Sequence, residues 1–344
     1  MKTSARPRIA IFGAGSIGCY IGGRLAQAGA NITLIGREHI GATLSQHGLK
    51  ITDLHGADMQ VPATQFRFSA KADAVAGADL VIVCVKSAAT REVSRALAQQ
   101  LTAQTLVISM QNGLANADVL RSELPHCRVL NGIVEFNVIN RGNGAFHQGS
   151  EGSLEAENDP VLAPFLPLFE AAGLPLLTHA EILPVQWAKL LLNLNNPINA
   201  LSNLPLKEEL SQRAFRRCVA LAQAEALALL DQANIKPTKL TPLPAHWIPK
   251  VLGVPDWLFK LLGNKMLAID PLARSSMWED LEAGRTTEIE WINGEVVRLA
   301  ASLGASAPIN QRLMTLIHQA EAGQRRSWGG TELLAELHNA QRIH

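Results

Sequence analysis

The sequence has no marked excess of charge of either sign and no long apolar run. Its 31 lysines and arginines nearly balance 30 aspartates and glutamates, which leaves a formal net charge of +1. This balance argues against a protein held on nucleic acid or on a membrane surface by bulk electrostatics. The apolar runs fall short of the ~18 residues that a membrane-spanning helix needs, so no membrane span is expected.

Cysteine is scarce, and its spacing forms no recognisable pattern. Cys19, Cys84, Cys127 and Cys218 lie far apart, and no two of them form a C-x-x-C pair. This predicts reduced, mostly buried thiols rather than a disulfide framework or a zinc site. The polar opening residues, Met1 to Pro7, do not resemble a signal peptide. Together these absences predict a cytoplasmic protein.

Several catalytic signatures are also missing. The only tyrosine is Tyr20, and Arg24 stands four residues later where a short-chain reductase has its lysine. No His-Glu-x-x-His sequence and no cluster of cysteine and histidine indicates a catalytic metal. None of the ten histidines lies in a recognisable catalytic setting. Carbonyl chemistry in this chain would therefore depend on a lysine.

What the sequence does contain is a glycine-rich turn near its N-terminus. Arg8–Phe12 has the composition of a buried strand, and Cys19–Gly29 that of a helix with one apolar face. Between them three glycines follow the G-x-G-x-x-G spacing, in the stretch Gly13, Ala14, Gly15, Ser16, Ile17 and Gly18. Gly13 would permit a tight turn, and Gly15 would let the backbone approach a pyrophosphate at the helix N-terminus. The stretch predicts a Rossmann-type dinucleotide-binding turn, in preference to an ordinary glycine-rich turn.

Short apolar segments alternate with helix-like segments from residue 8 to about residue 180. The strand candidates are Arg8–Phe12, Asn31–Ile35, Leu80–Val85, Thr105–Met110 and Arg128–Ile133. Helices are predicted at Ala88–Leu101 and Leu114–Leu124. This alternation predicts right-handed βαβ units and a doubly wound parallel sheet. Small antiparallel additions are expected at Leu49–Thr52, Met59–Pro62 and Phe146–Glu155.

From about residue 181 the apolar spacing becomes helical. The helix candidates are Ile182–Leu201, Lys207–Ile235, Ser275–Ala283, Glu288–Leu303 and Asn310–Ala322. The predicted fold class is therefore α/β, with a Rossmann-type domain at 1–179 followed by an all-α domain at 180–344. The ligand is expected between them, outside the carboxyl ends of the strands. Residues 236–270 hold five prolines and two tryptophans. We interpret this segment as an insertion packed on the helical domain, with a lid or a dimer contact as alternatives.

Three polar positions follow predicted strands, where a cofactor is expected. Arg37 stands where an NAD-binding chain usually has an acid for the ribose 2′-hydroxyl, and arginine can pair with a 2′-phosphate instead. Arg37 therefore favours NADPH, the alternative being a solvated surface arginine. Lys86 would contact ribose or phosphate, or would be an ordinary solvated lysine. Asn112 would hold the ribose or the nicotinamide region, although an ordinary Asn-Gly turn also explains it.

A helix in the second half carries an unusual set of polar residues. Lys189 and Asn193 are four residues apart and share a helix face, which Asn196 continues. A lysine and several amides among leucines cost free energy unless they have partners. Five asparagines between residues 193 and 203 weaken the helix, and Pro197 should kink it. Such departures are expected at a functional site, and a structural polar network is the alternative.

A second polar stretch runs from Ser275 to Gly294. Thr286 or Thr287 would cap a new helix there, with Glu290 completing a capping box. In that interpretation Glu288 is only a favourable acid in the first helical turn. The alternative is that Glu288 belongs to a functional site.

At this point the chain resembles the ketopantoate reductases (2-dehydropantoate 2-reductases) over nearly its whole length. The resemblance rests on the Gly13–Gly18 turn, Arg37, Lys86, the Gln111-Asn112-Gly113 turn, the Lys189–Asn193 helix with Asn196-Pro197, and Ser275-Ser276-Met277 leading to Thr287-Glu288-Ile289. It implies NADPH-dependent reduction of a 2-oxo acid, most simply 2-dehydropantoate to (R)-pantoate in pantothenate biosynthesis.

The resemblance also implies roles for particular residues. Lys189 would be the general acid, and Glu288 would help to hold the substrate hydroxyl. Ser276 would bind the substrate carboxylate, and Asn112 would lie at the junction of cofactor and substrate. Hydride would reach the C2 ketone, while the Lys189 ammonium stabilises the oxygen and donates the proton.

The same resemblance places asparagines around the substrate. Asn193 and Asn196 would line the pocket for the pantoyl group. The family usually has its second asparagine one residue further from the lysine, so Asn195 or Asn199 is an alternative to Asn196.

Two other functions remain open. A β-hydroxyacid dehydrogenase would share the Lys-x-x-x-Asn helix, but it would carry glycines before the lysine, and residues 183–188 contain none. A non-catalytic NADPH-binding sensor is the other alternative. The expected partner is a small 2-oxo acid, with no nucleic acid, membrane or metal, and a homodimer is left open.

Overall fold

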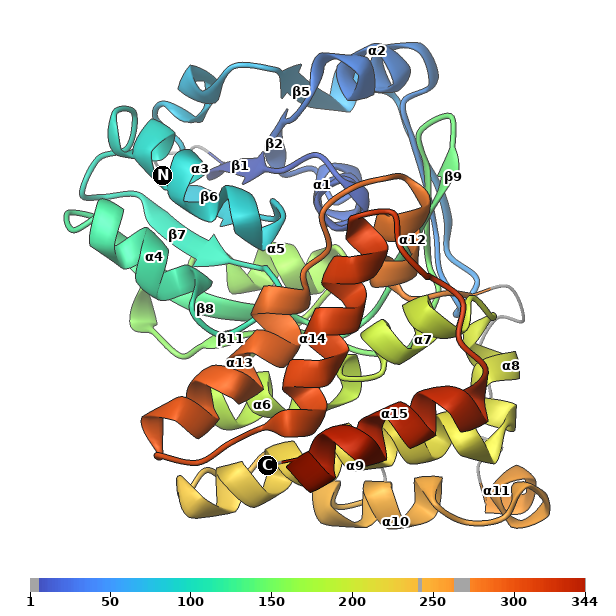
Figure 1. Cartoon of the computed structure of the whole chain (residues 1–344). Helices are drawn as coiled ribbons and strands as arrows, with labels where there is room; N and C mark the ends of the chain where they lie inside the picture. The colour runs from blue at the N-terminus through green and yellow to red at the C-terminus, as the bar shows by residue number, and fades with distance from the viewer. Residues whose placement is uncertain (1–5, 241–242, 263–272, 344) are drawn as a thin grey trace. The chain divides into compact units, whose positions relative to one another are not determined.

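The chain separates into two compact units. The structure, a computed structural model, describes residues 6–240, 243–262 and 273–343. Contacts between residues divide the chain into Met1–Ile182 and Leu183–His344 (Figure 1). The first unit is built on a sheet, whereas all the secondary structure described in the second unit is helical. This confirms the predicted fold class.

An eight-stranded sheet forms the centre of the first unit, in the order β12-β11-β8-β7-β6-β1-β2-β5. Its strands are β1 Arg8–Phe12, β2 Asn31–Ile35, β5 Phe66–Ser69, β6 Leu80–Val83, β7 Leu106–Ser109, β8 Arg128–Val134, β11 Leu154–Glu157 and β12 Leu176–His179. All pairings from β5 to β8 are parallel, whereas β11 is antiparallel to β8. The five predicted strands are thus five of the six strands in the parallel part, and β5 is the one that was not predicted.

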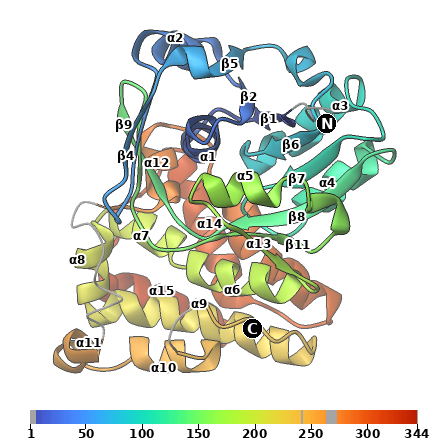
Figure 2. The same ribbon diagram turned by 180° about the vertical axis from the view of Figure 1, so that it is seen from behind.

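Helices cover both faces of this sheet. They are α1 Ser16–Gln27, α2 Glu38–His47, α3 Thr90–Ala98, α4 Asn116–Glu123 and α5 Leu166–Ala171. Residues of α1 and α5 share one apolar core, and residues of α3 and α4 share the core on the other face (Figures 1 and 2). Every residue of β6 and of β7 is buried, which explains their continuously apolar sequences.

A second sheet, in the order β4-β3-β10-β9, lies beside α1. Its strands are β3 Leu49–Thr52, β4 Asp58–Val61, β9 Val138–Gly142 and β10 Ala145–Gln148. A buried polar network joins it to α1, because the Tyr20 hydroxyl donates to Gln148 Oε1 (2.8 Å) and Arg24 pairs with Asp53 (2.9 Å). The single tyrosine is therefore a structural residue here.

Ten helices are described in the second unit. They are α6 Leu183–Asn193, α7 Asn196–Ser202, α8 Leu206–Ser211, α9 Arg213–Gln232, α10 Ile248–Leu252, α11 Asp256–Leu262, α12 Ser276–Glu282, α13 Ile289–Ser302, α14 Pro308–Glu321 and α15 Gly330–Ile343. The predicted helix over Ile182–Leu201 is wrong as a single element, since it ends at Asn193 and a new helix begins at Asn196. Pro197 lies in the first turn of α7, where its missing N–H costs nothing.

The described part of the 236–270 segment packs on α9. The fully buried Arg216 of α9 donates to the backbone carbonyls of Leu252 (3.1 Å) and Val254 (2.8 Å). It also pairs with Asp256 (2.9 Å) and lies 4.1 Å from the centre of the Phe259 ring. Residues 241–242 and 263–270 of the segment lie outside the described residues.

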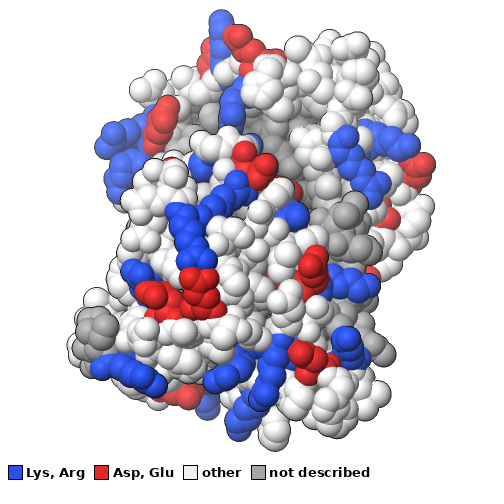
Figure 3. All heavy atoms as spheres, turned by 45° about the vertical axis from the view of Figure 1, so that its right-hand side comes forward, with Lys and Arg blue, Asp and Glu red and all other residues white. Residues whose placement is uncertain are grey.

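Charges of both signs are interspersed over the face of the molecule seen in Figure 3. No helix of the described ranges is both long and apolar enough to cross a bilayer. The four cysteines are all free thiols, and Cys19 and Cys218 are buried.

Candidate functional site

The glycine-rich turn joins β1 to α1 in a conformation that only glycine accepts easily. Gly13 has a φ of +117°, and a Cβ there would lie 2.7 Å from the backbone of Cys84 and Val85. A Cβ on Gly18 would lie 2.1 Å from the Gly13 carbonyl oxygen. A Cβ on Gly15 would meet no described atom within 4 Å, so the turn is open on that side.

The turn is also held to the end of β2. The backbone N–H groups of Gly13 and Ala14 both donate to the Ile35 carbonyl oxygen, at 2.9 and 2.8 Å. Helix α1 begins at Ser16, no described side chain caps it, and its first turn contains no acid. Its N–H groups and positive dipole end thus suit an anionic group such as a pyrophosphate.

Arg37 lies at the same edge of the sheet as the glycine-rich turn. Strand β2 pairs with β1 so that Ile35 is opposite Phe12, and Arg37 follows two residues later as the N-cap residue of α2. The Arg37 side chain is exposed. Gly36 brings the two segments close, since a Cβ there would lie 2.6 Å from Ala14 Cβ. We call this edge, formed by the carboxyl ends of β2, β1, β6 and β7, the carboxyl edge.

Lys86 and Asn112 follow the next two strands at the carboxyl edge. Lys86 is exposed after β6, and Asn112 is half-buried after β7. The Asn112 carbonyl oxygen accepts hydrogen bonds from Asn116 Nδ2 (2.6 Å) and Ser87 Oγ (3.0 Å). Gln111 Nε2 donates to the Val85 carbonyl oxygen (3.0 Å). The first unit therefore brings all the predicted cofactor residues to one edge of its sheet.

A buried polar network behind the Asn112 turn escaped the sequence analysis. Thr90 Oγ1 lies 2.7 Å from Asn116 Oδ1 and accepts from Gln111 Nε2 (2.8 Å). Thr90 and Asn116 are only 2% and 4% exposed. In the sequence, Thr90 and Asn116 are polar residues on the apolar sides of two predicted helices. The spacing of the apolar residues alone does not identify them as a network.

Lys189 and Asn193 share one face of α6, as their spacing predicts. Lys189 is half-buried between the buried residues Ala188 and Leu190, and Asn193 is the last residue of α6. Asn196 is the first residue of α7, so the expectation that it continues this face at helical spacing is wrong. The position of Asn196 is set by the interruption between α6 and α7. Its carbonyl oxygen accepts a hydrogen bond from Ser275 Oγ (3.2 Å).

Asn199 is completely buried, and its amide is engaged within the fold. Its Nδ2 donates to the Leu204 carbonyl oxygen (3.0 Å) and to Glu209 Oε2 (2.9 Å). Its Oδ1 accepts from the Ser275 backbone N–H (2.9 Å). Asn199 thus holds the segment before α12 and presents no amide group to solvent.

Ser275 and Ser276 have different surroundings at the start of α12. Ser275 is buried and is the N-cap residue, since its Oγ accepts from the Trp278 backbone N–H (3.1 Å). Ser276 is the first helical residue and is exposed. The contacts of Ser275 therefore bring Ser276 into the neighbourhood of Asn196 and Asn199.

Glu288 is 6% exposed and stands at the N-cap position of α13 without capping it. The expected capping box with Glu290 does not form, because Glu290 Oε1 bonds instead to His318 Nε2 (2.9 Å). Glu321 Oε1 accepts from the Thr287 backbone N–H (2.7 Å) and so holds the residue before Glu288. Burial lowers the pKa of His318, but its hydrogen bonds to Glu321 and Glu290 outweigh burial and raise it.

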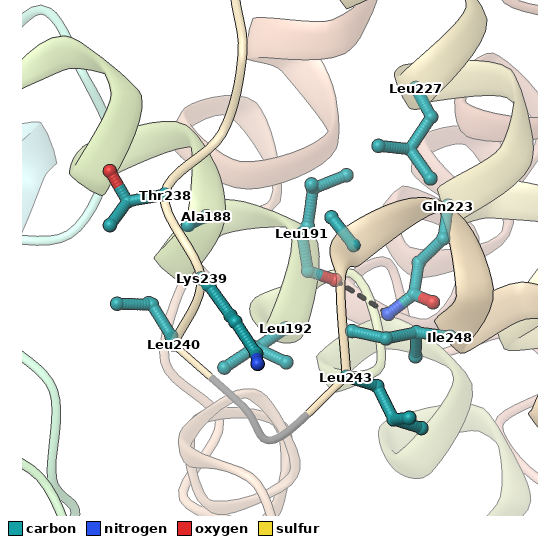
Figure 4. Close-up of a pocket in the computed structure, with 11 residues that line it drawn as sticks. Ala188, Leu191, Leu192, Gln223, Leu227, Thr238, Lys239, Leu240, Leu243 and Ile248 are labelled. Carbon is teal, nitrogen blue, oxygen red and sulfur yellow. Dashed lines mark hydrogen bonds between the residues drawn. The ribbon is translucent and has the colours of Figure 1, made fainter.

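A small cavity lies on another part of α6 (Figure 4). It is lined by Ala188, Leu191 and Leu192 of α6, by Gln223 and Leu227 of α9, and by Thr238, Lys239, Leu240, Leu243, Ala245 and Ile248. Gln223 Nε2 donates to the Leu191 carbonyl oxygen (2.9 Å). The cavity measures about 20 Å³, which is room for one water molecule. It is not a substrate pocket, and Lys189 does not line it.

Comparison with known proteins decides the family. The sequence model of the family "Ketopantoate reductase PanE/ApbA" matches residues 9–159, and that of its C-terminal part matches residues 181–321. The crystal structure of a PanE/ApbA family ketopantoate reductase from Ralstonia eutropha JMP134 is similar, with 30% identity and a TM-score of 0.78, covering 92% of this chain and 99% of that one. This chain belongs to the ketopantoate reductase family.

Other ketopantoate reductases match at similar length. The 2-dehydropantoate 2-reductase of Halobacterium salinarum is 27% identical over 330 residues, covering 91% of this chain and 99% of the relative. That of Archaeoglobus fulgidus is 26% identical over 329 residues, covering 92% and 98%. The fold is shared more widely, since the ternary structure of D-mandelate dehydrogenase with NADH and anilino(oxo)acetate has a TM-score of 0.74 at 21% identity.

Proposed function

We propose that this chain catalyses the NADPH-dependent reduction of 2-dehydropantoate to (R)-pantoate, in pantothenate biosynthesis. One observation supports this most. The chain has both the carboxyl-edge cofactor residues and the set Lys189, Asn193 and Glu288, and it covers nearly the whole length of relatives named 2-dehydropantoate 2-reductase. A cytoplasmic location and a homodimer remain predictions.

The form of the carboxyl edge supports NADPH as the cofactor. The open side of Gly15 and the uncapped start of α1 suit the pyrophosphate. The exposed guanidinium of Arg37 can pair with a 2′-phosphate at the end of β2. Lys86 and Asn112 would then contact the ribose and the region near the nicotinamide. NADPH, when bound, supplies the hydride.

The residues of the second unit would carry the rest of the chemistry. The Lys189 ammonium stabilises the negative charge that develops on the carbonyl oxygen and donates the proton, a contribution of about 10²- to 10⁴-fold. Ser276 binds the substrate carboxylate, and Glu288 accepts a hydrogen bond from the substrate hydroxyl. Asn193 and Asn196 provide further amide contacts.

The test is NADPH oxidation by the purified protein with 2-dehydropantoate beside several smaller 2-oxo acids. Lys189→Ala should lose most turnover, by about 10²-fold or more, while NADPH binding is kept. Lys207→Ala, which removes an exposed lysine of α8, is the matched control. Unchanged turnover in Lys189→Ala would remove Lys189 from the mechanism. Tight NADPH binding without turnover of any oxo acid would favour the sensor instead.

A further inference from the structure

Glu209 of α8 is an acid with no exposed surface, and it contacts Asn195 in the α6–α7 break and Asn199 within α7. Its Oε2 accepts from Asn199 Nδ2 (2.9 Å) and from Asn195 Nδ2 (3.4 Å). Two buried oxygens of this group receive no hydrogen bond from the described residues, namely Glu209 Oε1 and Asn195 Oδ1. Leaving buried polar atoms without partners costs free energy, so this pair requires an explanation.

One proton would satisfy both oxygens. A protonated carboxyl group opposite a primary amide forms a ring of two hydrogen bonds, in which the amide N–H donates to one carboxyl oxygen and the acid O–H donates to the amide oxygen. The bond from Asn195 Nδ2 to Glu209 Oε2 is the first half of that ring. The two oxygens that lack donors are the atoms that the second half would join.

We propose that Glu209 is a positioning residue that carries a proton at neutral pH and holds Asn195 and Asn199, which leaves Asn196, of these three, as the asparagine that faces the substrate. This inference rests on the proposed function for the role of Asn196. The amide of Asn199 is likewise engaged by Glu209 and Ser275. Asn196, which lies between Asn195 and Asn199 in the chain, is half-buried, and among the described residues its side chain does not bond to Glu209.

The charges around Glu209 agree with a neutral acid. Burial raises its pKa to about 8, more than the bonds from Asn199 and Asn195 lower it. The titratable group of α9 that interacts with it is Cys218, whose own thiol pKa burial raises to about 12, so it is neutral as well. On α8 itself Lys207 and Glu208 are exposed. On α9 the guanidinium of Arg216 bonds to Leu210 O and to Asp256 instead.

Loss of the proton should alter the residues that face the substrate, because a short series of hydrogen bonds connects Glu209 to them. Glu209 holds Asn199, which holds the Ser275 backbone N–H. The Ser275 hydroxyl in turn bonds to the Asn196 carbonyl and caps α12, where Ser276 begins the helix. Ionised Glu209 would face the Asn195 oxygen without a donor and would loosen this junction. We expect the KM for the oxo acid to rise above about pH 8, while the KM for NADPH stays constant.

The first experiment needs no substrate. Glu209→Gln supplies the same ring of donors and acceptors but cannot ionise. The native state holds a proton that the unfolded chain releases near pH 4.5, so wild-type stability falls as pH rises from about 4.5 to about 8. The Tm of the wild type should therefore fall more steeply between about pH 5 and pH 8 than that of Glu209→Gln. Glu208→Gln, an exposed neighbour on α8, is the control and should keep the wild-type slope.

Parallel Tm slopes in wild type and Glu209→Gln would overturn the proposal. If Glu209→Gln does not fold, infrared spectra of the wild type serve instead, since a protonated carboxyl band should be present at neutral pH and disappear near pH 9. A spectrum without that band at neutral pH would equally refute it.

The second experiment measures the KM for 2-dehydropantoate. Between about pH 7 and pH 9 it should rise at least about threefold in the wild type and stay level in Glu209→Gln. If Tm behaves as expected but the two proteins share one KM profile, Glu209 does not position the substrate side. Absence of all turnover counts against the proposed function alone, because the Tm comparison still decides the state of Glu209.

Discussion

Replacement of Arg216 by methionine should detach the 243–262 segment from α9. The guanidinium is fully buried and donates to the backbone carbonyls of Leu210, Leu252 and Val254 at 3.0, 3.1 and 2.8 Å. Methionine matches the apolar stem of arginine but lacks the guanidinium group. It removes every donor and the positive charge.

The expected loss follows from the groups left behind. Two buried carbonyl oxygens and the half-buried one of Val254 lose a charged donor, at about 1–3 kcal/mol each before the chain relaxes. Loss of the contact with the Phe259 ring, 4.1 Å away, adds about 1 kcal/mol. The ion pair with Asp256 adds little, since that carboxylate is half-exposed. Because the segment can move to hydrate its carbonyls, we expect a net loss of about 3–5 kcal/mol in the free energy of unfolding.

The assay combines urea denaturation with limited proteolysis. Arg216→Met should lower the denaturation midpoint and expose cleavage sites within residues 243–262 before the rest of the chain is cut. Arg217→Met, which removes the exposed neighbouring arginine, should stay within about 0.5 kcal/mol of the wild type. If Arg216→Met also stays within that range and resists protease as the wild type does, Arg216 does not hold the segment.

Three further changes test other parts of the structure. Gly13→Ala should cost about 2 kcal/mol or more and abolish NADPH binding, because φ is +117° and the new Cβ meets backbone at 2.7 Å; unchanged NADPH affinity by fluorescence titration would contradict this. Asn116→Ala should cost about 1–2 kcal/mol and raise the KM for NADPH, because the Asn112 carbonyl loses its bond at 2.6 Å; a pure stability effect with unchanged KM would argue that the turn does not position the cofactor. His318→Gln should flatten the pH dependence of stability, since the raised pKa makes the histidine stabilising below about pH 6.5 and that contribution is lost as pH rises through its folded pKa. Equal slopes for His318→Gln and the wild type would refute that role.

The sequence alone determined the features that depend on near neighbours in the chain. The β1–turn–α1 unit was predictable because the demands of a tight turn and of a close backbone approach fall on single glycines at fixed spacing. Five of the six parallel strands were predictable to within two residues, since a strand buried on both faces must be continuously apolar. The polar residues of the carboxyl edge, Arg37 above all, were also predictable, because each closely follows a predicted strand in the sequence.

Tertiary structure decided what depends on distant partners. Pro197 predicted a kink in one helix. The structure has two helices instead, with a separate α7 whose Asn199 bonds to Glu209 and to Ser275. Glu290 satisfied the local pattern of a capping box, yet it bonds to His318, 28 residues away.

The same distinction explains the asparagines. Local spacing treats Asn195, Asn196 and Asn199 as equivalent amides in one polar run. Their roles differ because Glu209, ten or more residues away, is buried beside two of them and not the third. No local pattern marks Glu209, since in the sequence it is one of two adjacent acids and only burial separates it from the exposed Glu208. A helical pattern states which face is apolar, whereas the fold decides which polar atoms on that face find a partner.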